Sequence, residues 1–302
     1  MDGKKTFVSY SWQQKEWVRE RLCPCLEAGG ATVLIDRQFV PGKGVLGQMD
    51  DLQDQADVHL LVLSPEYLQS DNCRHEMDRA LALDKNLDKG IVIPILREDC
   101  SLPDTIRQAL YLDLRQQDAA EPWDKLLQAC QADLGVSAPE WLQARDAIRL
   151  YLERNQSVNL VVKGQADWRG LLRHLVDDYF PDLLTIDLNS GATAARRGLV
   201  EEILWGLGES ADVPEEPEDL GLLHRVLNAR NITRLALTHF DLAASRENYG
   251  VDFFAALETL IMDPPRKLVL LAQSRSPFPA LLARFALPTP INIRSVELGG
   301  RP

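Results

Sequence analysis

A single glutamate, Glu76, stands where a catalytic carboxylate can work. The sequence predicts a helix that starts at Ser64-Pro65, because serine is a good N-cap and proline fits the first turn. The apolar residues that define the buried face of this helix recur at helical spacing: Cys73, Met77, Ala80 and Leu81. With a step of about 100° per residue, Glu76 lies about 60° from Cys73. We therefore expect its carboxylate at the rim of the buried face, lining a cleft, where a fixed negative charge can stabilise developing positive charge.

Polar and aromatic residues follow the ends of three predicted strands. Ser11 and Trp12 follow the first, Asp36 the second and Ser64 the third. In open parallel sheets, ligands bind beyond the carboxyl ends of the strands. The Trp12 ring offers an apolar plate for an aromatic ligand, although packing against the strand end is an equal alternative. Asp36 or Ser11 can bind ligand hydroxyls.

The elements that must position these residues follow a parallel α/β pattern, in which short apolar runs alternate with helical periodicity. The strands expected in the first half are 6–9, 32–35, 58–63, 91–96 and 110–114. One face of the first helix carries Val18, Leu22, Cys25 and Leu26. Pro24 should kink this helix, and Gly29-Gly30 should end it. The stripe of a closing helix consists of Trp123, Leu126, Leu127, Cys130 and Leu134.

A second α/β unit is expected after a linker at residues 135–139 (GVSAP). It should begin with a helix over 141–154 and continue with strands near 158–162, 184–188, 234–238, 267–272 and 291–296. The acidic, proline-containing stretch 209–219 (ESADVPEEPED) predicts a solvated loop. A chain of 302 residues is long enough for two cores. We therefore predict two domains, 1–136 and 140–302.

Four features of the first half, taken together, resemble a TIR domain. They are FVSYSW at 7–12, LID at 34–36, the loop RQFVPGKGVLG at 37–47 with the Pro-Gly of the family's BB loop, and LLVLSPEYLQSDNCRHEM at 60–77. The last segment matches the family's strand, serine and S-x-x-C-x-x-E helix. The match covers residues 4–134 and implies a flavodoxin-like, five-stranded parallel sheet. One departure is Asn72, where many family members carry tryptophan.

The resemblance implies cleavage of the bond between nicotinamide and ribose in NAD+, as in prokaryotic immune effectors that deplete NAD on infection. Nicotinamide leaves as a neutral amide, so no general acid is needed, whereas glycosidases need two carboxylates. Glu76 would hold ribose hydroxyls and stabilise the oxocarbenium ion. The enzyme would be an NAD+ nucleosidase or ADP-ribosyl cyclase-type hydrolase, with NAD+ as substrate and no cofactor or metal. Its expected substrate-binding residues are Tyr10, Ser11, Trp12, Asp36, Phe39, Gly42, Ser70 and Cys73.

Plainer alternatives stay open at this point. Ser70 and Cys73 can simply cap or fill the helix, and His75 is expected to be exposed. TIR domains that act purely as adaptors often lack the glutamate, so Glu76 favours an enzyme over a protein that only pairs with other TIR domains. In the resembled family, the loop that corresponds to 37–47 helps complete a composite site between neighbouring TIR domains. We therefore expect self-association, and activity that depends on it.

The second half resembles a P-loop NTPase of the STAND type that has lost its phosphate machinery. A working loop reads G-x-x-x-x-G-K-[ST]. Counted from Gly164, the lysine and hydroxyl positions are Gly170 and Leu171. RLALTHFD (234–241) resembles the Walker B strand with Asp241 as its remaining acid, and LVLLAQSRSP (268–277) the sensor strand. The resemblance implies that this domain senses a protein or ligand trigger or acts as a scaffold. An unrelated α/β domain and an active NTPase are the alternatives.

Composition argues against several other classes of protein. The net charge of −12 does not suit a general nucleic-acid binder, which needs a basic face. No apolar signal segment opens the chain, and no window approaches the roughly 18 apolar residues of a membrane span. Five scattered cysteines argue against a disulfide framework, and Cys23-Pro24-Cys25 has no second pair at metal-ligand spacing. We expect a cytoplasmic protein with reduced thiols and no membrane partner.

Overall fold

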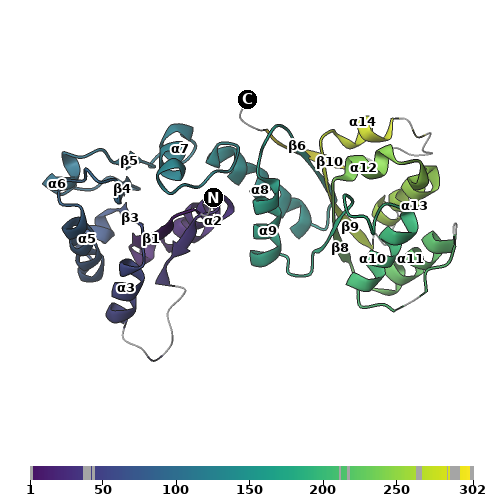
Figure 1. Cartoon of the computed structure of the whole chain (residues 1–302), viewed down its shortest axis with the longest axis horizontal. Helices are drawn as coiled ribbons and strands as arrows, with labels where there is room; N and C mark the ends of the chain where they lie inside the picture. Colours follow the sequence, from purple (N-terminus) through teal and green to yellow (C-terminus); the bar gives the residue numbers. More distant parts are fainter. Residues whose placement is uncertain are drawn as a thin grey trace. The chain divides into compact units, whose positions relative to one another are not determined.

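The chain divides into two compact units, each with its own sheet (Figure 1). The computed structural model describes residues 3–36, 42, 45–210, 212–215, 218–262, 267–283, 285 and 293–299. The first unit runs to Leu142 and also includes Arg169–His174, and the second consists mainly of the remaining residues. Both sheets have five strands, and every strand pair is parallel. The predicted α/β class with two parallel sheets is therefore confirmed.

The first sheet has the order β2-β1-β3-β4-β5 that a flavodoxin-like fold requires. β1 lies between β2 and β3, with Phe7 opposite both Leu34 and His59. Every residue of β3 is buried, as expected for a strand covered on both faces. The strands are β1 (Lys5–Tyr10), β2 (Thr32–Leu34), β3 (Val58–Leu63), β4 (Val92–Leu96) and β5 (Leu112–Asp113). β5 is shorter than the five residues predicted.

The helices of the first unit bury the predicted stripes, but the first of them is not a plain α-helix. The elements are η1 (Trp12–Gln14), α1 (Lys15–Trp17), η2 (Val18–Leu22), α2 (Cys23–Ala28), α3 (Val45–Asp54), α4 (Pro65–Gln69), α5 (Asp71–Leu83), α6 (Asp104–Arg107) and α7 (Ala120–Ala129). η2 is a π-helical turn, in which the amide of Cys23 donates to the carbonyl of Val18. Pro24 has no amide proton to continue an α-helical ladder at this point, so the predicted kink takes the form of a wider turn.

The predicted linker is more ordered than expected. Val136 and Ala138 are buried, and the last two linker residues already belong to α8 (Ala138–Glu153). The chain divides inside this helix, between Leu142 and Gln143. The closing helix predicted before this linker is shorter than expected. It is α7, which ends at Ala129, and the last two residues of its predicted apolar stripe, Cys130 and Leu134, are buried in the segment that follows.

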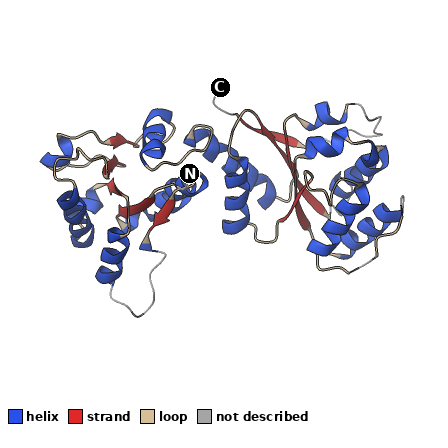
Figure 2. Ribbon diagram, in the orientation of Figure 1, coloured by secondary structure: helices blue, strands red, loops and turns tan. Residues whose placement is uncertain are grey.

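The second sheet has the order β10-β6-β9-β8-β7, with the first strand of the unit inside the sheet. Figure 2 shows its strands side by side, with helices on either side. The strands are β6 (Val158–Val162), β7 (Leu184–Asp187), β8 (Thr233–Thr238), β9 (Leu268–Ser274) and β10 (Arg294–Leu298). The helices after α8 are α9 (Trp168–Asp178), α10 (Arg196–Gly206), α11 (Glu218–Ala229), α12 (Phe240–Ser245), η4 (Glu247–Tyr249), α13 (Val251–Met262) and α14 (Phe278–Leu282).

Part of the stretch predicted as a solvated acidic loop is buried, so the prediction was wrong for Val213 and Asp219. Asp219 is completely buried in the first turn of α11. It accepts two hydrogen bonds from Arg196 of α10, from Nε at 2.9 Å and from Nη2 at 2.8 Å. Val213 is buried as well. A bidentate guanidinium satisfies both carboxylate oxygens, which is what allows a charged residue of this acidic run to enter the core.

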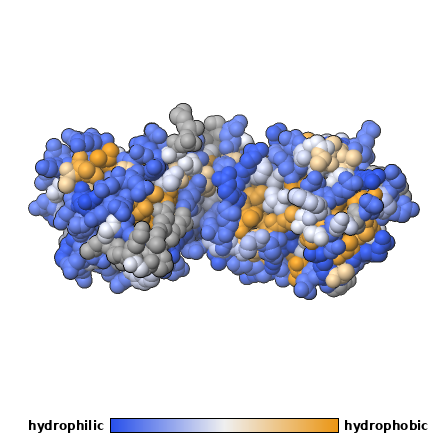
Figure 3. Space-filling view, turned by 60° about the horizontal axis from the view of Figure 1, so that its bottom comes forward, coloured by the Kyte–Doolittle hydropathy of each residue, from blue (hydrophilic) through white to orange (hydrophobic). Residues whose placement is uncertain are grey.

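The surface is mostly hydrophilic, with apolar side chains in separate groups over each unit (Figure 3). The most exposed large apolar side chains are Trp12, Leu110 and Trp205. Within the described part of the chain, no helix combines the length and the apolar character that crossing a membrane requires.

Candidate functional site

Two short helices, not one, place Glu76. Ser64 caps α4, where its Oγ accepts from the amide of Tyr67 at 3.2 Å. The chain then leaves helical geometry at Ser70, whose Oγ accepts from the amide of Cys73 at 3.3 Å and caps α5. The single helix predicted from Ser64 is therefore interrupted, because Ser70 adopts extended backbone angles. The capping role considered for Ser70 is present in the structure.

Glu76 lies deeper than predicted, buried within the apolar face of α5 instead of at its rim. Only 2% of the residue is exposed. Ser9 of β1 donates a hydrogen bond from Oγ to Glu76 Oε2 at 2.5 Å, and the Tyr67 hydroxyl lies 2.8 Å from the same Ser9 oxygen. Because the one proton of Ser9 points to the ionised carboxylate, Tyr67 must donate to Ser9. A directed chain of two buried hydroxyls therefore ends on Glu76.

The surroundings of Glu76 make it a carboxyl that titrates near neutrality. Burial raises its pKa to about 7, and the charges of Asp36 and Asp50 act in the same direction. The Ser9 hydrogen bond and the neighbouring His75 act against this rise. Glu76 therefore titrates close to neutral pH, where both its charged and its neutral forms are populated. Such an environment is typical of functional carboxyl groups.

Asp36 belongs to a second polar group at the carboxyl ends of β1 and β2. The Tyr10 hydroxyl donates to Asp36 Oδ1 at 2.7 Å, and Arg19 Nη2 donates to the same oxygen at 2.9 Å. Burial and the Asp36 carboxylate both raise the pKa of Tyr10, so the phenol stays protonated. Arg19 comes from the π-helical turn, which thus supplies the cation for this carboxylate.

Trp12 stands free of the core at the same edge. Trp12 is 69% exposed, and the Lys15 ammonium lies 3.7 Å from the centroid of its indole ring. The ring does not pack into the strand end, and it already attracts a cation to one face. Ser11 is buried, and its Oγ accepts from the amide of Gln13 at 3.3 Å. The ligand-binding roles of Trp12 and Ser11 stay predictions.

Cys73 and His75 have structural partners. The Cys73 thiol donates to the carbonyl of Tyr10 at 3.6 Å, which fastens α5 to the end of β1. Burial raises the pKa of this thiol to about 11, so it is a poor nucleophile. His75 is half-exposed, and its Nε2 lies 3.3 Å from Asp50 Oδ1.

The predicted loop residues divide between described and undescribed positions. Gly42 has a φ of 85°, in the left-handed region that favours glycine, with open space around its Cα. Phe39, Val40 and most of the loop at 37–47 lie outside the described residues. Their contribution to the site stays a prediction.

Ser9 and Tyr67 were not predicted as site residues, although both lie in the quoted motifs. Ser9 carried a usable signal, because it is a polar residue inside a buried strand, and such residues need a partner. Tyr67 carried none, because its position on α4 says nothing about a hydroxyl that meets β1. None of the five cysteines, all of which lie among the described residues, forms a disulfide bond.

Two positions that the P-loop resemblance singled out can be located in the structure. The loop after β6 leads into α9, with Gly164 in the left-handed region at a φ of 64°. Asp241 lies on α12, where its carboxylate accepts from the amide of Arg275 at 2.9 and 3.0 Å. Over the described residues, no group of three or more histidine, cysteine, aspartate or glutamate side chains is placed to hold a metal ion.

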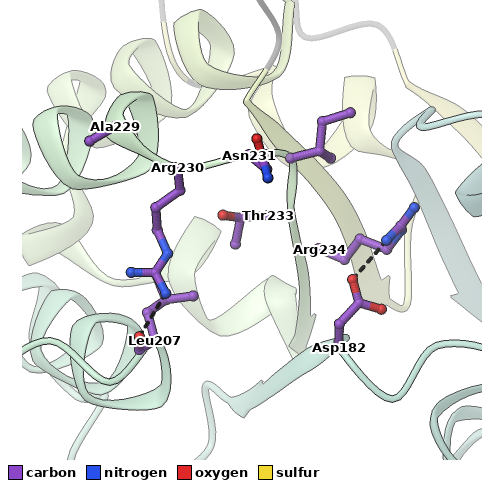
Figure 4. A pocket seen from close by; sticks show the side chains of 8 residues that line it. Asp182, Leu207, Ala229, Arg230, Asn231, Thr233 and Arg234 are labelled. Atoms are coloured by element: carbon purple, nitrogen blue, oxygen red, sulfur yellow. Dashed lines mark hydrogen bonds and ion pairs between the residues drawn. The ribbon is translucent and has the colours of Figure 1, made fainter.

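A cavity of about 500 Å³ in the second unit lies at the opposite, amino-terminal edge of β7 and β8 (Figure 4). Two arginines line it, and each already has a carboxylate partner. Arg230 Nη1 bonds Glu209 at 2.6 Å, and Arg234 Nη1 bonds Asp182 at 2.7 Å. The cavity therefore has neither the position nor the free charge that the predicted chemistry needs.

Comparison with known proteins decides what the first unit is. A family model described as "TIR domain" matches residues 6–127. Residues 6–127 are a TIR domain. The TIR domain contains β1 to β5 and Glu76, so the predicted resemblance is confirmed for this part of the chain. The second unit lies outside the matched residues.

The relatives found are Toll-like receptors. Toll-like receptor 1 of Homo sapiens is 35% identical over 72 residues, which is 24% of this chain and 9% of the receptor. Toll-like receptor 6 of Mus musculus is 36% identical over 72 residues, again 24% of this chain and 9% of the receptor. Toll-like receptor 2 of Mus musculus is 30% identical over 120 residues, 35% of this chain and 15% of the receptor.

A solved structure was found as well, the TIR domain of a Toll-related receptor from Hydra magnipapillata. It is 23% identical, with a TM-score of 0.37, and the match covers 42% of this chain and 97% of that one. The chain spans less than a tenth of the length of Toll-like receptors 1 and 6.

Proposed function

We propose that the TIR domain cleaves the bond between nicotinamide and ribose in NAD+, with Glu76 as its catalytic residue. The observation that carries the proposal is a buried carboxylate, held by a directed hydroxyl chain, with a pKa of about 7. Asp84, another buried carboxylate of the domain, serves only its own loop, since it accepts from the amides of Asp88 and Lys89. The Glu76 carboxylate does not hold a loop in this way.

The chemistry needs one negative charge. As the bond between C1′ and the pyridinium nitrogen breaks, its electron pair goes to nicotinamide, which leaves neutral. The positive charge passes to the ribose, where ionised Glu76 stabilises the oxocarbenium ion in a site with little water. Water then adds to C1′ and gives a proton to Glu76, whose pKa suits that role. An intramolecular nucleophile in place of water gives a cyclic product.

The alternative is a protein that signals only by pairing with other TIR domains. It is favoured by the names of the relatives, which are receptors. The two functions differ in one measurement, which is nicotinamide release by the purified full chain at high protein concentration. We expect release by the wild type and none by Glu76→Gln, which keeps the shape and removes the charge. Equal release by both proteins would refute the role of Glu76, and no release by either would favour the pairing function.

Self-association is part of the proposal, because the loop at 37–47 is the family's expected contact with a neighbouring TIR domain. Specific activity should rise more than linearly with protein concentration or with a crowding agent. Gly42→Pro should suppress turnover without unfolding the protein, since proline cannot adopt the φ of 85° found there. Constant activity per molecule in a protein that sedimentation shows to be monomeric would contradict this.

For residues 140–302 we propose a P-loop NTPase-like domain that neither binds nor hydrolyses ATP, and that responds to a protein or ligand trigger. Its support is a parallel sheet in which β9, the sensor-like strand, lies between β6 and the Walker B-like β8. Gly170 and Leu171 stand at the lysine and hydroxyl positions, and Asp241 is occupied by a backbone amide. Calorimetric titration of the full chain with magnesium and ATP should give no binding heat. Tight binding would overturn this proposal. A cytoplasmic location is part of the same proposal.

A further inference from the structure

α3 and α5 of the TIR domain are joined by polar contacts, and the innermost of them reaches Glu76. The Gln53 side chain lies in the last turn of α3 and is 1% exposed. Its Nε2 donates to the backbone carbonyl of Glu76 at 2.8 Å. Figure 1 shows α3 and α5 as neighbours in the first unit. Ser9 of β1 thus holds the side chain of Glu76, and Gln53 of α3 holds its main chain.

The orientation of the Gln53 amide is fixed by a second contact. Its Oε1 accepts from Arg79 Nε at 3.2 Å, and a flipped amide would place donor against donor and acceptor against acceptor. Arg79 is itself held by two carboxylates of α3, with Nε 3.3 Å from Asp50 and Nη2 in an ion pair with Asp54. The Gln53 donor therefore points to the Glu76 carbonyl in one defined direction.

We propose that Gln53 is a positioning residue for Glu76, so that α3 forms part of the working site of the TIR domain. The inference rests on the proposed function. Its physical reason is that the Glu76 carboxylate must lie against Ser9 within a few tenths of an ångström, and such alignment is set by groups that lock the main chain below it. The carbonyl of a helical residue has a second lone pair free for such a bond.

The test compares Gln53→Met with a matched control on the same segment. Gln55 is also a glutamine whose Nε2 donates to a backbone carbonyl, that of Asp51 at 2.8 Å, but it is exposed and its bond stays within its own segment. We expect Gln53→Met to lower kcat for NAD+ cleavage about tenfold or more, with KM changed less than about twofold. Gln55→Met should leave both unchanged. Equal kcat values for the two variants would overturn the inference.

A second readout separates positioning from a loss of fold. If Glu76 moves away from Ser9, it loses a hydrogen bond that favours its charged form, so its pKa should rise in Gln53→Met. The groups that face Glu76 are Ser9 of β1, Tyr67 of α4 and Asp50 of α3, with Asp36 after β2 and with Cys73 and His75 on its own helix. None of these is changed by the substitution. NMR titration of 13C-labelled glutamate carboxyls measures the shift without any turnover.

This readout also distinguishes failure of the inference from failure of the proposed function. A wild type that does not cleave NAD+, together with a raised Glu76 pKa in Gln53→Met, would refute the enzyme and keep the positioning role. An unchanged pKa would refute the positioning role in either case. Should Gln53→Met not fold, Gln53→Asn keeps a buried amide and withdraws the donor by one methylene. It should show a smaller rise in pKa and a smaller fall in kcat.

Discussion

Replacing Ser9 by alanine should separate the protonation of Glu76 from its position. The substitution removes the hydroxyl that donates to Glu76 Oε2 at 2.5 Å and leaves α5 in place. A hydrogen bond to a charged group contributes about 1.5–3 kcal/mol. Its loss should therefore raise the Glu76 pKa from about 7 to between about 8 and 9.

The consequence for activity can be worked out from the ionised fraction. At pH 7 that fraction should fall from about one half to between about 9% and 1%, so kcat should fall about five- to fiftyfold. Near pH 10 the carboxylate is ionised again, and most of the activity should return. The assay is the pH profile of nicotinamide release by wild type and Ser9→Ala. Thr6→Val, at another buried hydroxyl of β1, is the control, and its profile should match that of the wild type.

A profile for Ser9→Ala that is reduced by the same factor at every pH would refute this reasoning. It would mean that Ser9 acts on the position of the carboxylate or on the substrate, and not on the proton. An unchanged profile would mean that another donor replaces the hydroxyl.

Three further predictions concern stability and binding. Because the folded-state pKa of Glu76 lies above its ordinary value of 4.5, its contribution to stability is complete below pH 4.5 and is lost as the pH rises through 7. Glu76→Gln should therefore be more stable than the wild type at pH 8, by up to about 3 kcal/mol in urea denaturation, and no more stable at pH 4. Trp12→Ala should raise KM about five- to tenfold with kcat little changed, since an exposed ring contributes binding only. An unchanged KM would show that the Trp12 ring does not bind the substrate. Arg196→Met should destabilise the second unit by about 3–5 kcal/mol because it leaves the buried Asp219 carboxylate without a counter-charge, whereas Arg197→Met, at two exposed ion pairs, should cost less than about 1 kcal/mol.

The sequence predicted the elements of the first unit well, because β3 and the helical stripes carry strong apolar periodicity. It placed Glu76 at the rim of the buried helix face and did not predict its burial. Helical phase describes one helix alone, and Glu76 is covered by Ser9 from 67 positions earlier and by Tyr67 from a separate helix. That α4 and α5 are separate depends on Ser70, where a cap competes with continued helix.

The errors in the second unit have a related cause. Asp219 was taken for solvent because its neighbours are acidic and proline-rich. Its partner Arg196 lies 23 positions away on another helix, and composition cannot reveal a pairing of that kind. The end of the predicted linker is helical for a local reason, since Pro139 fits the first turn of a helix as well as it fits a loop.

Because Glu76 is buried, its carboxyl group also keeps a bound proton at a pH where an ordinary glutamate has lost it. With a pKa of about 7, this carboxyl is partly protonated at neutral pH. A cationic ligand that enters beside Glu76 lowers that pKa and expels the proton into the buffer. Ligand affinity must then rise with pH, and the heat of binding must change with the ionisation enthalpy of the buffer. Calorimetry in two buffers would thus count protons at this one carboxyl before any bond is broken.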